Sequence, residues 1–205
     1  MDLFPPSPSA NLLPRDGTVR YHGPIFSPAE SRTILADLLE QIPWQHDEVV
    51  LFGRRIVTAR QVAWFADKGI PYTYSGSTKQ SRAWSPLLQS LKATVQQHTG
   101  AQFNACLLNL YQHGNEGMSW HSDDEPSLHP NAPIASLSFG AERRFRFRHK
   151  DTRETVSLLL EHGSLLEMRD KTQSHWQHCL PKTTKVTTPR INLTFRRMLT
   201  PDEER

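Results

Sequence analysis

The chain has 205 residues, a length that fits one domain with a sizeable buried core. Hydrophobic residues make up 37% and charged residues 22%, a composition that excludes a wholly disordered chain. The sequence contains no run of about 18 apolar residues and no secretory signal pattern, so we expect a protein that neither crosses a membrane nor is secreted.

The net charge and the cysteine content bear on the partners and the cellular compartment of the protein. The net charge of +3 is too small to prove a nucleic-acid partner by itself. Two cysteines, Cys106 and Cys179, lie far apart, which excludes a disulfide framework and a cysteine-rich zinc site. We therefore expect a reducing compartment, the cytoplasm of a bacterium or the nucleus of a eukaryote. No interface signal stands out, so a monomer is expected.

The first half of the chain predicts an arm and two helices. Residues 1–16 contain four prolines and no periodicity, which predicts a flexible arm. Ser27 and Glu30 flank a proline in a capping-box pattern, and apolar residues follow at helical spacing. A second helix is predicted from Ser85 until Gly100 stops it. The apolar stripes of both helices should cover one face of a sheet.

The second half reads as short strands separated by Gly, Pro, Asp or Asn. The expected strands are 103–111, 134–139, 144–149, 155–160, 164–168, 175–180 and 190–196. This spacing predicts an antiparallel sandwich or jelly roll. No glycine-rich loop joins a strand to a helix, which disfavours Rossmann and P-loop enzymes. Residues 199–205 form a polar tail.

The segment 190–196 alternates polar and apolar side chains. In a strand, its four polar residues share one face. The ordinary explanation is an edge strand with that face in water. The alternative is a barrel interior in which two guanidiniums bind a dicarboxylate. Asn109 and Tyr111 share a face of another strand, and both can donate a hydrogen bond to a carboxylate.

His121 and Asp123 are candidate metal ligands two residues apart. A second histidine would complete a set of two histidines and one carboxylate that leaves coordination positions open. We expect His178 in that place, with His175 as the alternative. A hydrolytic zinc site accepts the same ligand types, but it has no need of the anion-binding strand.

Together these residues resemble the AlkB family of Fe(II)- and 2-oxoglutarate-dependent dioxygenases. The matching motifs are Asn109-x-Tyr111, His121-x-Asp123, His178 and Arg190-x-Asn192-x-Thr194-x-Arg196. The likeness spans about residues 20–198 and is greatest to the DNA-repair branch. It implies an α+β fold: a single domain over 17–198 with a double-stranded β-helix (jelly roll) core at 101–198. The extension 17–100 would carry substrate-contacting hairpins, with its helices packed on one sheet.

The resemblance also implies residue roles. Fe(II) would be held by His121, Asp123 and His178. The 2-oxoglutarate would be bound by Asn109, Tyr111, Arg190, Asn192, Thr194 and Arg196, with Arg196 near the keto acid and Asp123. Tyr74 and His121 would sandwich the base, Asp124 and Glu125 would lie at the mouth of its pocket, and Tyr72 and Ser75 would be further contacts. Phe52 would be a wedge in the duplex, or otherwise an aromatic of the hairpin core.

Two basic clusters bear on the partner. The first is Arg143, Arg144, Arg146, Arg148 and Lys150. The second is Arg54, Arg55 and Arg60. Each is either a solvated face or a set of phosphate contacts; Arg146 is our candidate substrate contact.

The implied reaction uses Fe(II), 2-oxoglutarate and O2. It demethylates bases such as 1-methyladenine and 3-methylcytosine in DNA and releases formaldehyde. Two other hypotheses stay open: the same chemistry on RNA or on a substrate other than nucleic acid, and a catalytically dead nucleic-acid binding module.

Overall fold

The structure is a computed structural model that describes residues 10–51, 54–68, 70, 72–74, 77–79, 81–200 and 203. The helices are α1 (Pro28–Gln41), α2 (Pro86–Thr99) and α3 (Thr172–His175). The first strands are β1 (Thr18–Pro24), β2 (Gln45–Leu51), β3 (Arg54–Ala66), β4 (Tyr72–Tyr74), β5 (Ser77–Lys79) and β6 (Ala105–Tyr111). The later strands are β7 (Met118–His121), β8 (Ile134–Gly140), β9 (Arg143–His149), β10 (Thr155–Leu160), β11 (Ser164–Arg169), β12 (Trp176–Leu180) and β13 (Arg190–Arg196).

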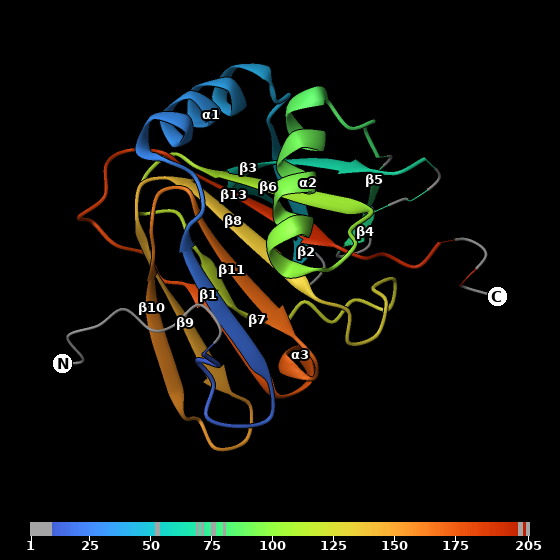
Figure 1. Cartoon of the computed structure of the whole chain (residues 1–205), viewed down its shortest axis with the longest axis vertical. Helices are drawn as coiled ribbons and strands as arrows, with labels where there is room; N and C mark the ends of the chain where they lie inside the picture. Colours follow the sequence, from blue (N-terminus) through green and yellow to red (C-terminus); the bar gives the residue numbers. More distant parts are fainter. Residues whose placement is uncertain are drawn as a thin grey trace.

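Two antiparallel sheets pack face to face (Figure 1). The larger has seven strands in the order β1-β11-β8-β13-β6-β3-β2, and the smaller has the order β10-β9-β12-β7. Side chains from both, among them Leu166 and Phe147, fill the space between them. From β6 to β13 the chain crosses repeatedly from one sheet to the other, with β9 and β10 paired as neighbours in the smaller sheet, as in a jelly roll. The predicted α+β fold with a jelly-roll core is confirmed.

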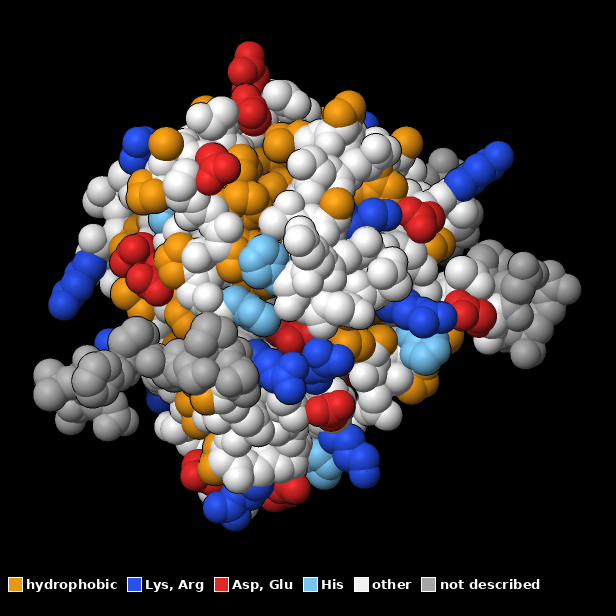
Figure 2. All heavy atoms as spheres, viewed as in Figure 1, with side chains coloured by type: hydrophobic (Ala, Val, Ile, Leu, Met, Phe, Trp, Pro, Cys, Tyr) orange, Lys and Arg blue, Asp and Glu red, His pale blue; other side chains and the backbone are white. Residues whose placement is uncertain are grey.

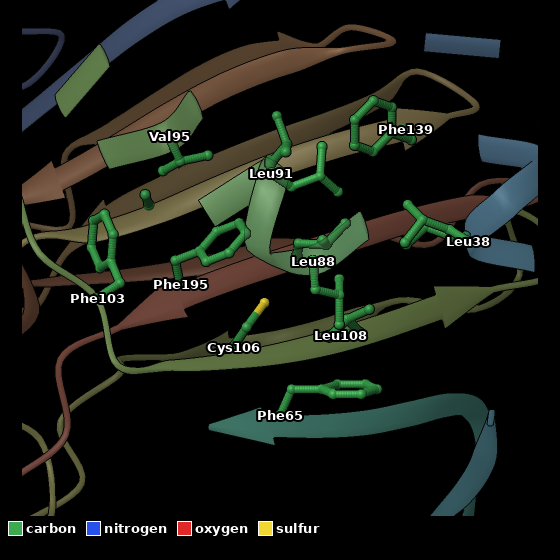
Figure 3. Packing of buried hydrophobic residues seen from close by; sticks show 14 of the residues in the cluster. Leu38, Phe65, Leu88, Leu91, Val95, Phe103, Cys106, Leu108, Phe139 and Phe195 are labelled. Atoms are coloured by element: carbon green, nitrogen blue, oxygen red, sulfur yellow. The ribbon is translucent and has the colours of Figure 1, made fainter. Parts of the chain in front are cut away.

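Both predicted helices are present on the outer side of the larger sheet. The Ser27 hydroxyl accepts from the Glu30 amide, and the Glu30 carboxylate accepts from the Ser27 amide, so the capping box starts α1. Gly100 ends α2 with a left-handed φ of 68°. Leu38 and Leu88 contribute to the apolar core under the helices (Figure 3). Hydrophobic side chains reach the surface between α1 and α2 (Figure 2).

All seven predicted strands are present, with three differences around them. The four-residue strand β7 was not predicted, because it is too short and too polar for a periodic signal. His175 was expected in a strand, but it ends the short helix α3. The edge strand β1 was also missed. Among the described residues, no helix is long and apolar enough to cross a membrane.

Part of the predicted arm packs on the domain. The Asn11 side chain accepts from the amides of Leu13 and Val19, and Leu13 is buried in the core between the sheets. The Trp176 indole donates to the Arg15 carbonyl. The described residues of the segment 1–16 therefore differ from the flexible arm expected there.

Candidate active site

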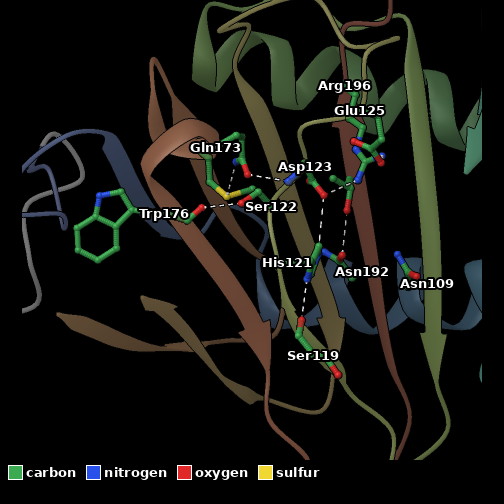
Figure 4. A network of polar contacts seen from close by, with 12 residues as sticks. Asn109, Ser119, His121, Ser122, Asp123, Glu125, Gln173, Trp176, Asn192 and Arg196 are labelled. Atoms are coloured by element: carbon green, nitrogen blue, oxygen red, sulfur yellow. Dashed lines mark hydrogen bonds and ion pairs between the residues drawn. The ribbon is translucent and has the colours of Figure 1, made fainter. Parts of the chain in front are cut away.

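The three predicted metal ligands come together between the sheets. His121 ends β7, and its partner across the β7–β12 pair is His178. Asp123 follows two residues after His121. One ligand atom from each residue lies within 4.8 Å of the other two. Figure 4 shows His121 and Asp123 beside Arg196 of β13.

Hydrogen bonding prepares His121 as a ligand. Its Nδ1 lies 2.8 Å from the Ser119 carbonyl. Because a carbonyl oxygen only accepts, Nδ1 must carry the proton and donate it. The lone pair is then on Nε2, which is 3.8 Å from Asp123 Oδ1.

Burial and charge set the protonation of the other two ligands. Burial, reinforced by His121, lowers the pKa of His178 to about 3, so its imidazole is neutral and can ligate a metal. Burial alone would raise the pKa of Asp123, but the charged Arg196 guanidinium lowers it below its ordinary value. An Arg196 nitrogen lies 2.8 Å from Asp123 Oδ1. Two imidazole nitrogens and one carboxylate are a ligand set that fits a divalent iron ion.

A second group of His and Asp residues, His149, Asp151 and His175, is also close-packed. His149 Nδ1 accepts from the backbone amides of Asp151 and Thr152, so Nε2 carries the proton, and it lies 3.2 Å from Asp16 Oδ2. With that proton in place Nε2 cannot ligate a metal. His175, the alternative ligand, belongs to this group and not to the His121 site.

The predicted anion-binding residues line one cavity of about 60 Å³ together with the three ligands. Those residues are Asn109, Tyr111, Arg190, Asn192, Thr194 and Arg196. β13 lies between β8 and β6 in the middle of the larger sheet. The edge-strand explanation of segment 190–196 is therefore wrong, and its polar face points into the protein.

Arg190 provides a test of whether this cavity fits a dicarboxylate. Its guanidinium is buried, and one terminal nitrogen donates to Ser138 Oγ. Its Nε has no hydrogen-bond partner among the described residues. Burial is the main reason that the pKa of Arg190 falls to about 10, so the group stays charged at neutral pH. A buried cation with an unused donor beside a cavity fits the carboxylate of 2-oxoglutarate.

Sequence reasoning missed several residues of this site. Ser136 and Ser138 on β8 accept hydrogen bonds from Asn192 and Arg190. Their alternation in the segment 134–139 placed both on one face, which was an available signal. The Phe145 ring stacks on His178 at a centroid distance of 5.4 Å. It covers one side of the site with apolar surface.

The predicted base contacts are described only in part. Phe52 and Ser75 lie outside the described residues, and for Tyr72 and Tyr74 the structure gives the strand β4 but not the side chains. Asp124 and Glu125 line a cavity of about 400 Å³ that also reaches Asp123. Glu125 Oε1 is 3.3 Å from Arg196, whereas Asp124 is largely exposed.

The β9 basic cluster divides between two sides of the strand. Arg143 points inward, is buried, and donates to the carbonyls of Gly114, Glu116 and Pro181. It is therefore not a phosphate contact. Arg148 lies over the Trp120 ring at 4.3 Å, and Arg146 lies over it at 5.7 Å. Both remain partly exposed.

Comparisons with known proteins show which family this chain is similar to. The family model described as the 2OG-Fe(II) oxygenase superfamily matches residues 17–196. The mouse protein named DNA oxidative demethylase ALKBH2 is 39% identical over 204 residues, which cover 94% of this chain and 85% of the mouse protein. The human protein of that name is 41% identical over 186 residues, covering 85% and 71%.

A second kind of relative and a solved structure extend the comparison. The human alpha-ketoglutarate-dependent dioxygenase alkB homolog 3 is 40% identical over 177 residues, covering 82% of this chain and 61% of that protein. The solved structure of OsALKBH1 matches with a TM-score of 0.55 at 16% identity, over 82% of this chain and 91% of that one. The latter likeness concerns the fold alone.

Proposed function

The chain belongs to the AlkB family of the 2OG-Fe(II) oxygenase superfamily, and we propose that it is a DNA oxidative demethylase. Its reaction would restore N-alkylated bases, of the 1-methyladenine and 3-methylcytosine type, by direct reversal. The observation that carries the proposal is one cavity that joins two histidines and a carboxylate to a buried anion-binding strand. These residues together suit a metal ion with a dicarboxylate bound next to it.

In this proposal His121, Asp123 and His178 hold the iron. Fe(II) held there would supply, with 2-oxoglutarate and O2, the oxidation of the methyl carbon to a hydroxymethyl group, which the base would then lose as formaldehyde. The protein contributes position and shielding. Arg196 keeps Asp123 ionised, and Phe145 with Phe147 keeps water from one side of His178.

Arg190 would bind the distal carboxylate of 2-oxoglutarate, oriented by its bond to Ser138. Asn109, Tyr111, Asn192 and Thr194 line the same cavity and would supply neutral contacts. The buried cation fixes which end of the cosubstrate lies deepest. The keto acid is thereby directed toward the metal ligands.

Substrate recognition is proposed from charge. Bases methylated on the Watson–Crick face carry a positive charge, and Asp124 and Glu125 supply carboxylates beside the metal ligands. Such a base must leave the helix to reach a buried metal. His121, half-buried at the cavity, would then stack on one face of the base, with Tyr74 on the other face and with Tyr72 and Ser75 close by. Phosphate contact is proposed for Arg146 and Arg148.

Mass spectrometry of short oligonucleotides tests the proposal. Single-stranded DNA, duplex DNA and RNA, each with one 1-methyladenine or 3-methylcytosine, are incubated with protein, Fe(II), 2-oxoglutarate and ascorbate. We expect loss of the methyl group from DNA. Release of succinate without demethylation would mean that the protein is a dioxygenase that acts on another substrate. Absence of both products would leave a nucleic-acid binding module and overturn the proposal.

A further inference from the structure

Arg60 is a largely buried arginine on β3 whose side chain joins two other strands. Its Nε donates to Asn109 Oδ1 on β6 at 3.0 Å, and one terminal nitrogen lies 3.2 Å from Asp47 Oδ2 on β2. The side chains of Arg60 and Asp47 are only 11% and 8% exposed. The sequence allowed Arg60 to be a phosphate contact. The structure instead commits its guanidinium to groups inside the protein.

The sheet register explains how Arg60 reaches Asn109. Val62 of β3 lies opposite Asn109, and alternate residues of a strand share a face, so Arg60 is on the same inner side of the sheet. On the other flank of β6, Asn192 is the register partner of Asn109, and Figure 4 shows the two amides on neighbouring strands. Asn109 is thus held between an arginine and the cosubstrate cavity.

The contact fixes how the Asn109 amide is turned. A guanidinium only donates, so the atom that faces Arg60 must be the carbonyl oxygen Oδ1. The Nδ2 group, with both of its protons, then points away from Arg60. Asn109 is almost fully buried and lines the cavity, so Nδ2 is the group that it offers to a bound anion. With the amide reversed, Oδ1 would face the anion and repel it.

We infer that Arg60 is a positioning residue of the cosubstrate pocket, which acts by holding Asn109 as a donor to 2-oxoglutarate. The inference rests on the proposed function. Arg60 does not line the cavity, so its effect passes through Asn109. Through Asp47 the same side chain also ties β2 to β3 beside the pocket.

The test measures binding of 2-oxoglutarate without turnover, by calorimetry with Mn(II) in place of iron. Arg60→Met should weaken binding of 2-oxoglutarate about tenfold, because the Asn109 amide loses the charge-assisted hydrogen bond that orients it. Arg60→Lys keeps the charge but has no fork to reach both partners, so it should rescue only part of the loss. Asn109→Ala should weaken binding by a similar factor. The double variant should lose no more than Asn109→Ala alone.

Arg169→Met is the matched control. Arg169 is also a partly buried arginine paired with a carboxylate, Glu167, but it donates to the carbonyl of Thr99, the last residue of α2. Its removal should lower the melting temperature and leave 2-oxoglutarate affinity unchanged. A structural role alone would give Arg60→Met the same result as this control.

Two outcomes would overturn the inference while the proposed function stands. One is an Arg60→Met protein that binds 2-oxoglutarate as tightly as the wild type. The other is a double variant in which the two effects multiply, because Arg60 would then act independently of Asn109. If the wild type itself fails to bind 2-oxoglutarate, the proposed function fails first, and the two failures are thereby distinguished.

Discussion

His121 and His178 are direct register partners on the antiparallel strands β7 and β12, with ring centroids 4.2 Å apart. Side chains of such a pair leave the sheet on the same side. The pairing of β7 with β12 therefore brings the two imidazoles together. Asp123, paired with Arg196, adds the carboxylate.

Removing a proposed ligand should abolish turnover and leave the fold intact. His178→Ala and Asp123→Ala should each lower succinate formation by more than about 100-fold, because the metal loses one of three protein ligands. Circular dichroism and thermal unfolding report on the fold. His175→Ala is the matched control, since His175 lies three residues away and outside the site. Activity that survives in His178→Ala would mean that another residue is the ligand.

Arg190 should control 2-oxoglutarate affinity more than the chemical step. Arg190→Met removes a buried charge-assisted contact worth about 1.5–3 kcal/mol, so KM for 2-oxoglutarate should rise about 10- to 100-fold. Ser138→Ala removes only the group that orients Arg190, and it should give a smaller rise of the same kind. Steady-state kinetics with varied 2-oxoglutarate measure both. An unchanged KM in Arg190→Met would mean that the distal carboxylate of 2-oxoglutarate does not bind Arg190.

Much of the fold could be predicted because local signals agree with the global structure. The Ser27 capping box and Gly100 marked the helix ends, and the segment 190–196 alternated as a strand does. The strand β7 could not be predicted, because its four residues are too few to show an alternating pattern and its position depends on pairing with β12. The helical conformation of His175 could not be predicted either, because a single helical turn is too short to show a periodic pattern.

The site was predictable where its residues sit in short motifs, and not where contacts join distant strands. The polar face of β13 could be read from alternation alone. That Arg60 bonds to Asn109, 49 positions away, could not. Nor could the burial of Arg143, since a basic run gives no sign of which member turns inward. Burial of a charge depends on partners that only the folded chain supplies.

The outer face of β9 should contribute to nucleic-acid binding through charge. Replacing Arg146 and Arg148 together by Ala should weaken binding and lower the slope of log K against log salt by up to about 1.8, or about 0.9 for each phosphate that the protein no longer neutralises. Fluorescence anisotropy of labelled duplex DNA at several salt concentrations measures the slope. Arg32→Ala, an exposed arginine of α1 on the far side of the larger sheet, should leave it unchanged. Equal slopes for the wild type and the double variant would show that Arg146 and Arg148 do not contact phosphates and only face solvent.

Phe52 should matter for duplex substrates and little for single strands. In duplex DNA the extruded base leaves a gap, and an apolar wedge in that gap offsets part of the unstacking cost of a few kcal/mol. A single strand has no such gap. Phe52→Ala should therefore lower demethylation of duplex DNA about tenfold or more and change single-strand activity by less than about twofold.

The hairpin offers its own control for that prediction. Val57 lies on β3 and is 62% exposed, so Val57→Ala removes apolar surface from the β2–β3 pair at another position. It should leave both substrates unaffected. Equal reductions on duplex and single strand in Phe52→Ala would mean that Phe52 is an aromatic of the hairpin core, whose removal disturbs the anchoring of β2 and β3 through Asp47 and Arg60. In that case 2-oxoglutarate affinity should fall as well, because Arg60 would no longer hold Asn109.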